Sequence, residues 1–238
     1  MTTDPATTDP SPNPSPPTGG PWRVLVTAGP TWEPVDEVRY LGNRSSGRMG
    51  RELARASALS GHATTLLLGP GAAEPTGPGT SAIAIERFQS AADLDTLLRD
   101  CWPDHDILVM AAAVADHRPV RRPGMPRKLR RADGATTIDL EPVPDLLAGI
   151  AELPHPGTRI GFALEPAEEL EASARRKLAA KKLHGIVANP LETMESDRID
   201  GRLLLADGTE QAPPMRPCSK ADFATWLMDA IATVHQDR

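Results

Sequence analysis

The sequence predicts an α/β protein with a Rossmann-like, doubly wound and mostly parallel sheet. From residue 23 onward, short aliphatic runs alternate with segments of helical periodicity, the pattern of parallel strands joined by crossover helices. The first run, Arg23 to Gly29, ends in glycine, as buried strands that enter a ligand loop do. Asp207-Gly208 is typical of a β-hairpin turn. We therefore expect one domain over residues 22–238 with a small hairpin near its end.

The composition limits what this domain does. Residues 1–21 are mainly Thr, Pro, Ser, Asp and Gly, which bury too little apolar surface to order a chain, so we expect a disordered tail. The net charge of −6 argues against a broadly basic surface for nucleic acid. No apolar run approaches the ~20 residues of a membrane span, and the amino terminus is unlike a signal peptide. We expect a cytoplasmic protein without a membrane partner.

The elements after the first strand follow from periodicity and from Gly and Pro punctuation. Residues 32–39 are charged and interrupted by proline, so we expect an irregular loop there. The strands are expected at 63–70, 81–88, 106–113, 136–140, 158–164 and 185–189, and the helices at 51–59, 91–99, 144–151, 168–182 and 220–234. The two cysteines, Cys101 and Cys218, lack metal-ligand spacing; reduced thiols are favoured and a disulfide stays open.

Residues 40–50 are the strongest functional signal. Gly42, Gly47 and Gly50 permit positive φ and close backbone approach, while Ser45 and Ser46 offer hydroxyls for capping the next helix and for phosphate oxygens. With a strand before it and a helix after it, the segment suits an anion cradle at a helix N-terminus. An ordinary turn with a capped helix is the alternative. The spacing matches neither G-x-x-x-x-G-K-[ST] nor G-x-G-x-x-G, so a standard kinase or dehydrogenase label is unwarranted.

Candidate side chains flank this cradle. Arg39 suits a bidentate contact to phosphate or carboxylate, or else an ion pair with Asp36 or Glu37. Asp116 follows a run of small residues at a strand end, where it suits a ribose or base amine; a helix N-cap is the alternative.

Lysines form the second group of candidates. Lys177 and Lys181 share a helix face and suit a triphosphate, although solvated lysines are the default. The basic run around Lys128 is by charge alone a solvated surface, or else a flexible arm that closes over anions.

Longer motifs resemble one family. The resemblance rests on Ala28-Gly29-Pro30-Thr31, Glu33-Pro34, Asp36, Val38-Arg39-Tyr40, Asn43, Ser45-Ser46-Gly47, Met49-Gly50, Ala111 to Asp116, the basic run at Lys128, Gly161-Phe162-Ala163 with Glu165, and Val187-Ala188-Asn189. These resemble the phosphopantothenoylcysteine synthetases, and the likeness covers essentially everything from Arg23 to the last helix.

The resemblance implies a ligase of coenzyme A biosynthesis. Such enzymes activate the carboxylate of 4′-phosphopantothenate with a nucleoside triphosphate, CTP in most bacteria rather than ATP, and release pyrophosphate. Cysteine's amine then displaces the nucleotide from the acyl-nucleotide. Mg²⁺ is implied as cofactor and a homodimer as the assembly. Many bacterial relatives carry a flavin-dependent decarboxylase domain in front; since only the tail precedes Arg23, we expect no decarboxylase activity and no flavin.

The resemblance also assigns roles. Asn43 matches the asparagine tied to turnover of the acyl-nucleotide, and Arg39 matches a substrate-binding arginine. Lys128 matches the catalytic lysine of a flexible flap, and this assignment replaces the interpretation of the basic run as a solvated surface. The nucleotide-binding set it implies, together with the cradle, is Ser45, Ser46, Gly47, Ala111, Ala112, Asp116, Lys128, Phe162, Lys177 and Lys181. It assigns no metal ligands.

Several positions depart from the family pattern. Trp32 replaces arginine, His117 replaces tyrosine, Val143 and Pro190 replace an asparagine and an aspartate, and arginines replace flap lysines at 130 and 131. These departures keep two alternatives open: a divergent paralogue that ligates another carboxylate, and a non-catalytic nucleotide-binding module. A dinucleotide-dependent oxidoreductase is the weakest alternative, because the glycine fingerprint after the first strand is missing.

Overall fold

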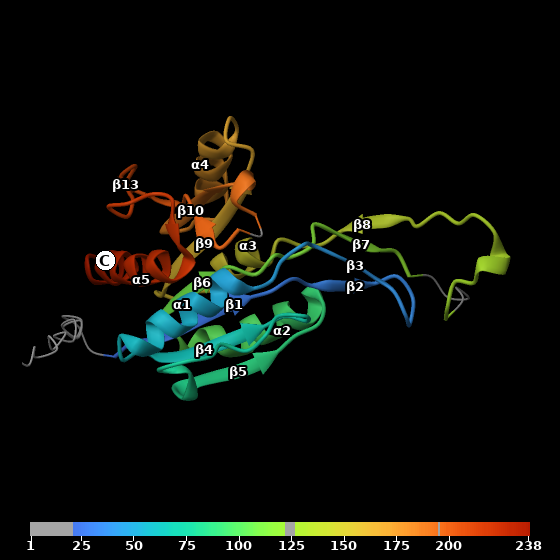
Figure 1. Ribbon diagram of the computed structural model, residues 1–238, viewed down its shortest axis with the longest axis horizontal. Coiled ribbons are helices and arrows are strands. Elements are labelled where there is room, and N and C mark those ends of the chain that lie inside the picture. The colour runs from blue at the N-terminus through green and yellow to red at the C-terminus, as the bar shows by residue number, and fades with distance from the viewer. Residues whose placement is uncertain (1–20, 122–126, 195) are drawn as a thin grey trace, which may run out of the picture.

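The computed structural model describes residues 21–121, 127–194 and 196–238, and its centre is a twisted, mostly parallel sheet. Among the described residues, this sheet has eight strands in the order β13-β12-β10-β9-β6-β1-β4-β5 (Figure 1). The parallel strands are β1 (Arg23–Ala28), β4 (Ala63–Leu68), β5 (Ile83–Arg87), β6 (Ile107–Met110), β9 (Thr158–Glu165) and β10 (Gly185–Pro190). The antiparallel strands β12 (Arg202–Leu205) and β13 (Glu210–Gln211) form the predicted hairpin. The α/β class is therefore confirmed.

Helices cover both faces of this sheet. Side chains alternate along β1, so Val24 and Val26 face one layer while Leu25 faces the other. The first layer holds α1 (Arg48–Leu59) and α5 (Lys220–Gln236), which pack on each other. The second layer holds α2 (Ala91–Cys101), α3 (Leu146–Ala151) and α4 (Leu170–Ala180). Each face thus buries its own aliphatic core, as a doubly wound sheet requires.

Two long hairpins form an arm that projects from the body (Figure 1). One pairs β2 (Trp32–Pro34) with β3 (Tyr40–Gly42), and the other pairs β7 (His117–Pro119) with β8 (Leu140–Pro142). The expected irregular loop at 32–39 is therefore wrong in its first part, because residues 32–34 form a short strand that pairs with β3. Proline is accepted at Pro34 because this position is at the end of the strand. The strand expected at 136–140 begins only at Leu140.

The other predicted elements are confirmed within a few residues at each end, and minor elements complete the chain. The small strands β11 (Arg198–Ile199) and β14 (Cys218–Ser219) pair beside α5. Short 3-10 turns are η1 (Thr80–Ala82), η2 (Trp102–Asp104), η3 (Arg131–Asp133) and η4 (Leu191–Thr193). Both cysteines are free thiols. Among the described residues, no helix is both long and apolar enough to cross a membrane. Residues 1–20 of the expected tail and residues 122–126 of the flap lie outside the described residues.

Imidazoles and arginines cluster at the amino ends of the parallel strands. The Nδ1 atom of His184 accepts the backbone N–H of Arg159 at 2.9 Å, and the Nδ1 atom of His235 is 2.8 Å from the Thr158 hydroxyl. Burial, followed by the charges of Arg238 and Arg159, lowers the pKa of His184 from 6.5 to about 4. Because the Nδ1 atom must stay unprotonated to accept its hydrogen bond, this imidazole is neutral in the folded protein at pH 7.

The His184 pKa predicts acid-sensitive stability. Between pH 6.5 and about 4 the unfolded chain binds a proton at His184 that the folded chain does not, so the free energy of unfolding falls as the pH falls through this window. Partial exposure limits the expected loss to about 1–2 kcal/mol. In His184→Asn the amide oxygen replaces the acceptor without titrating. Urea unfolding from pH 7.5 to 4.5 should show a shallower pH slope for this variant; equal slopes would contradict the assignment.

Candidate ligand cleft at the carboxyl edge of the sheet

A cleft of about 900 Å³ opens where the parallel strands end. Its walls come from both helical layers and from the strand ends between them. They comprise residues 42–50, 110–116, 143–147 and 162–164 together with Lys177, Lys181, Asn189, Thr193, Met194, Ile199 and Lys220. Open α/β sheets bind ligands at this edge, because loops on both faces diverge there. The position of the cleft matches the one predicted from the small residues after β6.

The amino end of α1 forms one wall. Gly47 is the N-cap at φ 67°, and a Cβ there would lie 2.9 Å from the backbone nitrogen of Gly29. A Cβ on Gly50 would lie 2.6 Å from the carbonyl oxygen of Thr27. These glycines let the first turn of α1 sit against the end of β1, with its amide groups at the cleft. The predicted anion cradle therefore has the required geometry.

The cradle serines do not cap α1 in the way expected. The N-cap is Gly47, which makes no side-chain cap. Instead the Ser45 hydroxyl accepts the Gly47 N–H at 3.3 Å, and the Ser46 hydroxyl accepts the Arg48 N–H at 3.4 Å. Both serines still line the cleft. The capping expectation is corrected because the left-handed backbone at Gly47 places the helix start one residue later.

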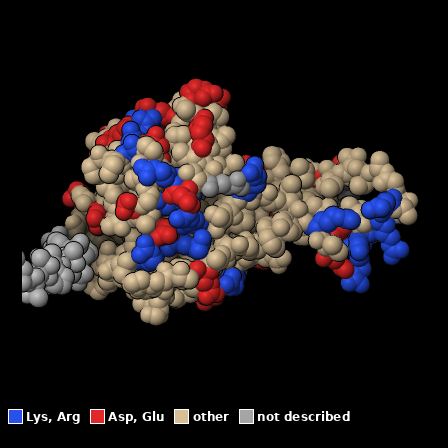
Figure 2. All heavy atoms as spheres, in the orientation of Figure 1, with Lys and Arg blue, Asp and Glu red and all other residues tan. Residues whose placement is uncertain are grey.

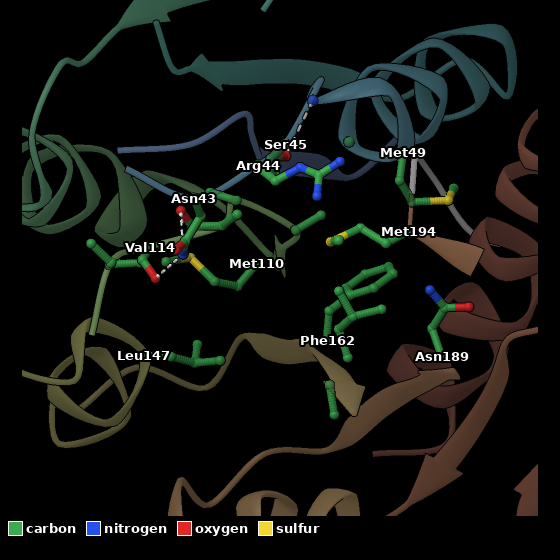
Figure 3. Close-up of a pocket in the computed structure, with 18 of the residues that line it drawn as sticks. Asn43, Arg44, Ser45, Met49, Met110, Val114, Leu147, Phe162, Asn189 and Met194 are labelled. Atoms are coloured by element: carbon green, nitrogen blue, oxygen red, sulfur yellow. Dashed lines mark hydrogen bonds between the residues drawn. The ribbon is translucent and has the colours of Figure 1, made fainter. Parts of the chain in front are cut away.

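Asn43 joins the cradle to the end of β6 (Figure 3). Its Nδ2 group donates to the carbonyl oxygens of Val114 at 2.9 Å and Ala113 at 3.3 Å. Both amide hydrogens are thus used, and the Oδ1 atom remains as an acceptor in the cleft lining. The segment that Asn43 contacts is itself fixed, since the Thr31 hydroxyl accepts the Ala115 N–H at 3.0 Å.

The predicted helix lysines lie on the opposite wall and carry acidic partners. Lys177 Nζ is 2.6 Å from Glu165 and Lys181 Nζ is 2.9 Å from Asp145. The hydrogen bond from Lys177 is the main cause that lowers the pKa of Glu165. Asp145 also caps α3, because its other oxygen accepts the Ala148 N–H at 3.1 Å. These ion pairs hold both ammonium groups at the cleft.

The remaining nucleotide candidates line the middle of the cleft. Ala111, Ala112 and Phe162 are half-buried there, and Asp116 is exposed at its rim. The helix N-cap alternative for Asp116 is wrong, since β7 follows it directly. Phe162 lies near Asn189 and Met194 in the view of Figure 3.

Asn189 presents donors to the same region. Its Oδ1 atom accepts the Thr193 hydroxyl at 2.8 Å, which leaves the amide hydrogens for the cleft. Pro190, one of the departures from the family pattern, continues β10 and pairs with Glu165.

Arg39 and Lys128 lie on the arm and do not line this cleft. Arg39 pairs with Asp36 at 2.7 Å, the alternative that the sequence allowed, and donates to the Leu129 carbonyl at 3.0 Å. The buried Asp36 carboxylate also accepts the Leu129 N–H at 3.0 Å, the main cause that lowers the pKa of Asp36. Lys128 is exposed, and Figure 2 shows basic side chains gathered at this end of the molecule.

A second cavity of about 380 Å³ lies at the base of the arm. Arg39 lines it together with Trp32, whose indole stacks on Tyr40 with ring centroids 3.9 Å apart. Trp32, which replaces an arginine of the family pattern, therefore packs at the base of the arm and does not line the main cleft.

The sequence analysis missed a group of cleft residues. Arg44 and Arg48 lie within the predicted cradle segment 40–50 but were assigned no role, and Met194, Ile199 and Lys220 lie outside every candidate segment. Of these last three, Lys220 carried a usable signal: Ser219-x-x-Asp222 is a helix start, which puts a lysine in a first turn where cations are disfavoured. In the described part of the chain, no three His, Cys, Asp or Glu side chains come together as a metal site.

The fold defines a Rossmann-like α/β protein with a cleft at the carboxyl edge of its sheet. The chain belongs to the family described as the DNA/pantothenate metabolism flavoprotein C-terminal domain, whose model matches residues 21–234. This confirms the resemblance noted from the sequence.

Curated relatives agree with this assignment. The chain is 37% identical over 225 residues to the coenzyme A biosynthesis bifunctional protein CoaBC of Mycobacterium tuberculosis, covering 89% of this chain and 52% of that protein. It is 33% identical to the CoaBC of Bacillus subtilis, covering 89% and 51%. The chain thus spans about half the length of these relatives.

Solved structures share the architecture. The crystal structure of the C-terminal domain of a CoaBC protein matches with a TM-score of 0.73 and 28% identity, covering 91% of this chain and 97% of that one. The DNA/pantothenate metabolism flavoprotein of Streptococcus pneumoniae matches with a TM-score of 0.77 at 21% identity, over 89% and 99%. The second match supports the fold alone.

Proposed function

We propose that this chain is a phosphopantothenate–cysteine ligase of coenzyme A biosynthesis that acts in the cytoplasm. One observation carries the proposal: the cleft gathers the cradle, Asn43 and every nucleotide-binding candidate except Lys128. The names of the CoaBC relatives, together with the family motifs, supply the pathway. The substrates are 4′-phosphopantothenate, a nucleoside triphosphate, with CTP favoured over ATP, and cysteine.

The proposed chemistry places heavy negative charge in one cleft. In the first step a carboxylate oxygen attacks the α-phosphorus, and the bond to pyrophosphate breaks. Donors fixed before the reaction stabilise such charge without reorganisation. Here the amide groups of the α1 turn and the ammonium groups of Lys177 and Lys181 are those donors. They lie on two walls, which suits two phosphorylated ligands.

Mg²⁺ fits this cleft as an ion brought in by the nucleotide. Mg²⁺ commonly binds through substrate phosphates and one or two carboxylates. Asp116 and Asp145 are the carboxylates of the lining, and Asp145 is already committed to Lys181. Among the described residues of the lining, Asp116 is therefore the carboxylate that would hold it. When bound, the ion neutralises phosphate charge.

Asn43 acts in the second step. Its amide hydrogens are held by two carbonyl groups, so its free Oδ1 atom accepts a hydrogen bond rather than donating one to an acyl phosphate. Cysteine's amine has N–H groups to donate as it attacks the acyl carbon and expels the nucleotide. We propose that Oδ1 orients this amine, which refines the role that the family resemblance implies.

The ligase assignment predicts pyrophosphate release from 4′-phosphopantothenate, Mg²⁺ and CTP, with an amide product that appears in mass spectra only when cysteine is present. ATP should support slower turnover. Release without an amide would favour a paralogue with another acceptor. Nucleotide binding without release, from folded protein, would favour the non-catalytic module and contradict the proposal.

For Asn43→Ala we expect unchanged CTP affinity and accumulation of the acyl-nucleotide, with amide formation slowed about 10²-fold, the usual effect of removing one oriented hydrogen-bonding group. Rapid-quench experiments with mass detection measure both species. Normal amide formation by a variant of unchanged melting temperature would remove Asn43 from the mechanism.

The position of Lys128 leads us to propose a homodimer in which the arm of one copy serves the cleft of the other. Large apolar side chains are exposed on or beside the arm strands, with Val38 60%, Tyr40 51%, Ile138 45% and Leu140 48% exposed. A second copy would cover them. It would also bring the exposed Lys128 to a cleft, whereas in one chain Lys128 lies outside the lining.

Mixed variants test this arrangement. We expect Lys128→Ala to lose activity without unfolding, and refolded mixtures with Asn43→Ala to regain about a quarter of wild-type activity, since half of the dimers are mixed and each has one intact site. Light scattering should give a dimer. Failure to regain activity in a confirmed mixed dimer would place Lys128 at its own cleft, whereas normal activity of Lys128→Ala alone would place Lys128 outside catalysis.

A further inference from the structure

Lys220 is the first residue of α5 and lines the cleft beside the cradle. Its backbone N–H donates to the Asp197 carbonyl at 3.3 Å, so the start of the helix is anchored there. The side chain is half-buried. It belongs to the α1 and α5 layer, on the other face of the sheet from Lys177 and Lys181.

The local surroundings disfavour a cation at this position. The first turn of a helix carries partial positive charge. Burial and the nearby Arg48 guanidinium lower the pKa of Lys220, and Asp197 opposes them only in part. Ser219 and Asp222 already cap the helix, so the ammonium group adds nothing to capping.

Its neighbours differ in being paired. Arg48 forms an ion pair with Asp197, Lys177 with Glu165 and Lys181 with Asp145. Across the described chain, no carboxylate forms a salt bridge with Lys220. A cation that is kept against local costs and faces a ligand cleft is expected at functional sites rather than structural ones.

We propose that the Lys220 ammonium binds a phosphoryl group of a ligand on the α1 and α5 side of the cleft. This rests on the proposed function, which supplies two phosphoryl sources: the β- and γ-phosphates of the nucleotide, and the 4′-phosphate of the acid. Either anion would offset the repulsion between Lys220 and Arg48 and would supply the counter-charge that Lys220 lacks among the described residues. Lys220 thereby selects phosphorylated substrate from the wall opposite Lys177 and Lys181.

The test compares Lys220→Gln, which keeps most of the stem, with Lys220→Arg. Lys182→Gln is the control, because Lys182 is exposed, pairs with Glu152 and lies outside the cleft lining. We expect Lys220→Gln to raise one KM about 10- to 100-fold with a smaller change in kcat, as for loss of one charge-assisted hydrogen bond. Lys220→Arg should keep the KM close to the wild-type value, and neither variant should have a lowered melting temperature.

Substrate pairs separate the two sources. If Lys220 binds the 4′-phosphate, the variant loses preference for 4′-phosphopantothenate over unphosphorylated pantothenate. If it binds the nucleotide, the KM for CTP rises equally with both acids. Unchanged KM values in an active variant overturn the proposal, and so does a lowered melting temperature without a KM change.

Calorimetry with inorganic phosphate and inorganic pyrophosphate gives a readout independent of turnover. Weaker binding of either anion by Lys220→Gln than by Lys182→Gln supports the subsite even if wild-type protein forms no amide, in which case the proposed function fails alone. Equal binding of both anions by the two variants overturns the subsite.

Discussion

The close approach of α1 to the end of β1 is the constraint on which the site depends. It exists because Gly47 and Gly50 have no Cβ: at both positions a methyl group would meet backbone atoms of the first strand or its turn within 3 Å. Any larger residue would push the helix start away from the sheet. The amide groups of the first turn would then lose their position beside Asn43 and the β6 end, and with it the proposed anion site.

The parallel sheet separates ligand chemistry from stability. At the carboxyl edge Lys177 and Lys181 are paired with carboxylates, whereas no carboxylate of the described residues forms a salt bridge with Lys220. At the amino edge the neutral imidazole of His184 accepts the backbone N–H of Arg159. Protonation of His184 costs folding free energy, and His184 is not among the residues that line the cleft.

Sequence reasoning succeeded where local rules decide the outcome. The alternation that sends Val24 and Leu25 to opposite layers is a local pattern, and so are the Asp207-Gly208 turn and the glycine cradle. It failed where partners are distant in sequence. Pro34 joins a strand because Tyr40 pairs with it, and the fate of Arg39 depends on Asp36 together with the arm residue Leu129. Lys220 reaches the cleft only through the packing of α5 on α1.

Ion pairing in the free cleft bears on how ligands enter it. Lys177, Lys181 and Arg48 each have a carboxylate partner, so a phosphate must exchange with that partner and gains less than the full charge interaction. Such exchange favours a ligand that supplies several phosphate oxygens at once, because one oxygen replaces only one carboxylate contact. Lys220 has no salt bridge among the described residues, so it would bind a phosphoryl group without first losing a carboxylate contact. Among the described residues, the cleft therefore combines cations that already have carboxylate partners with Lys220, which has none; in the proposed complex, an interaction of Lys220 with a phosphoryl group would add directly to binding.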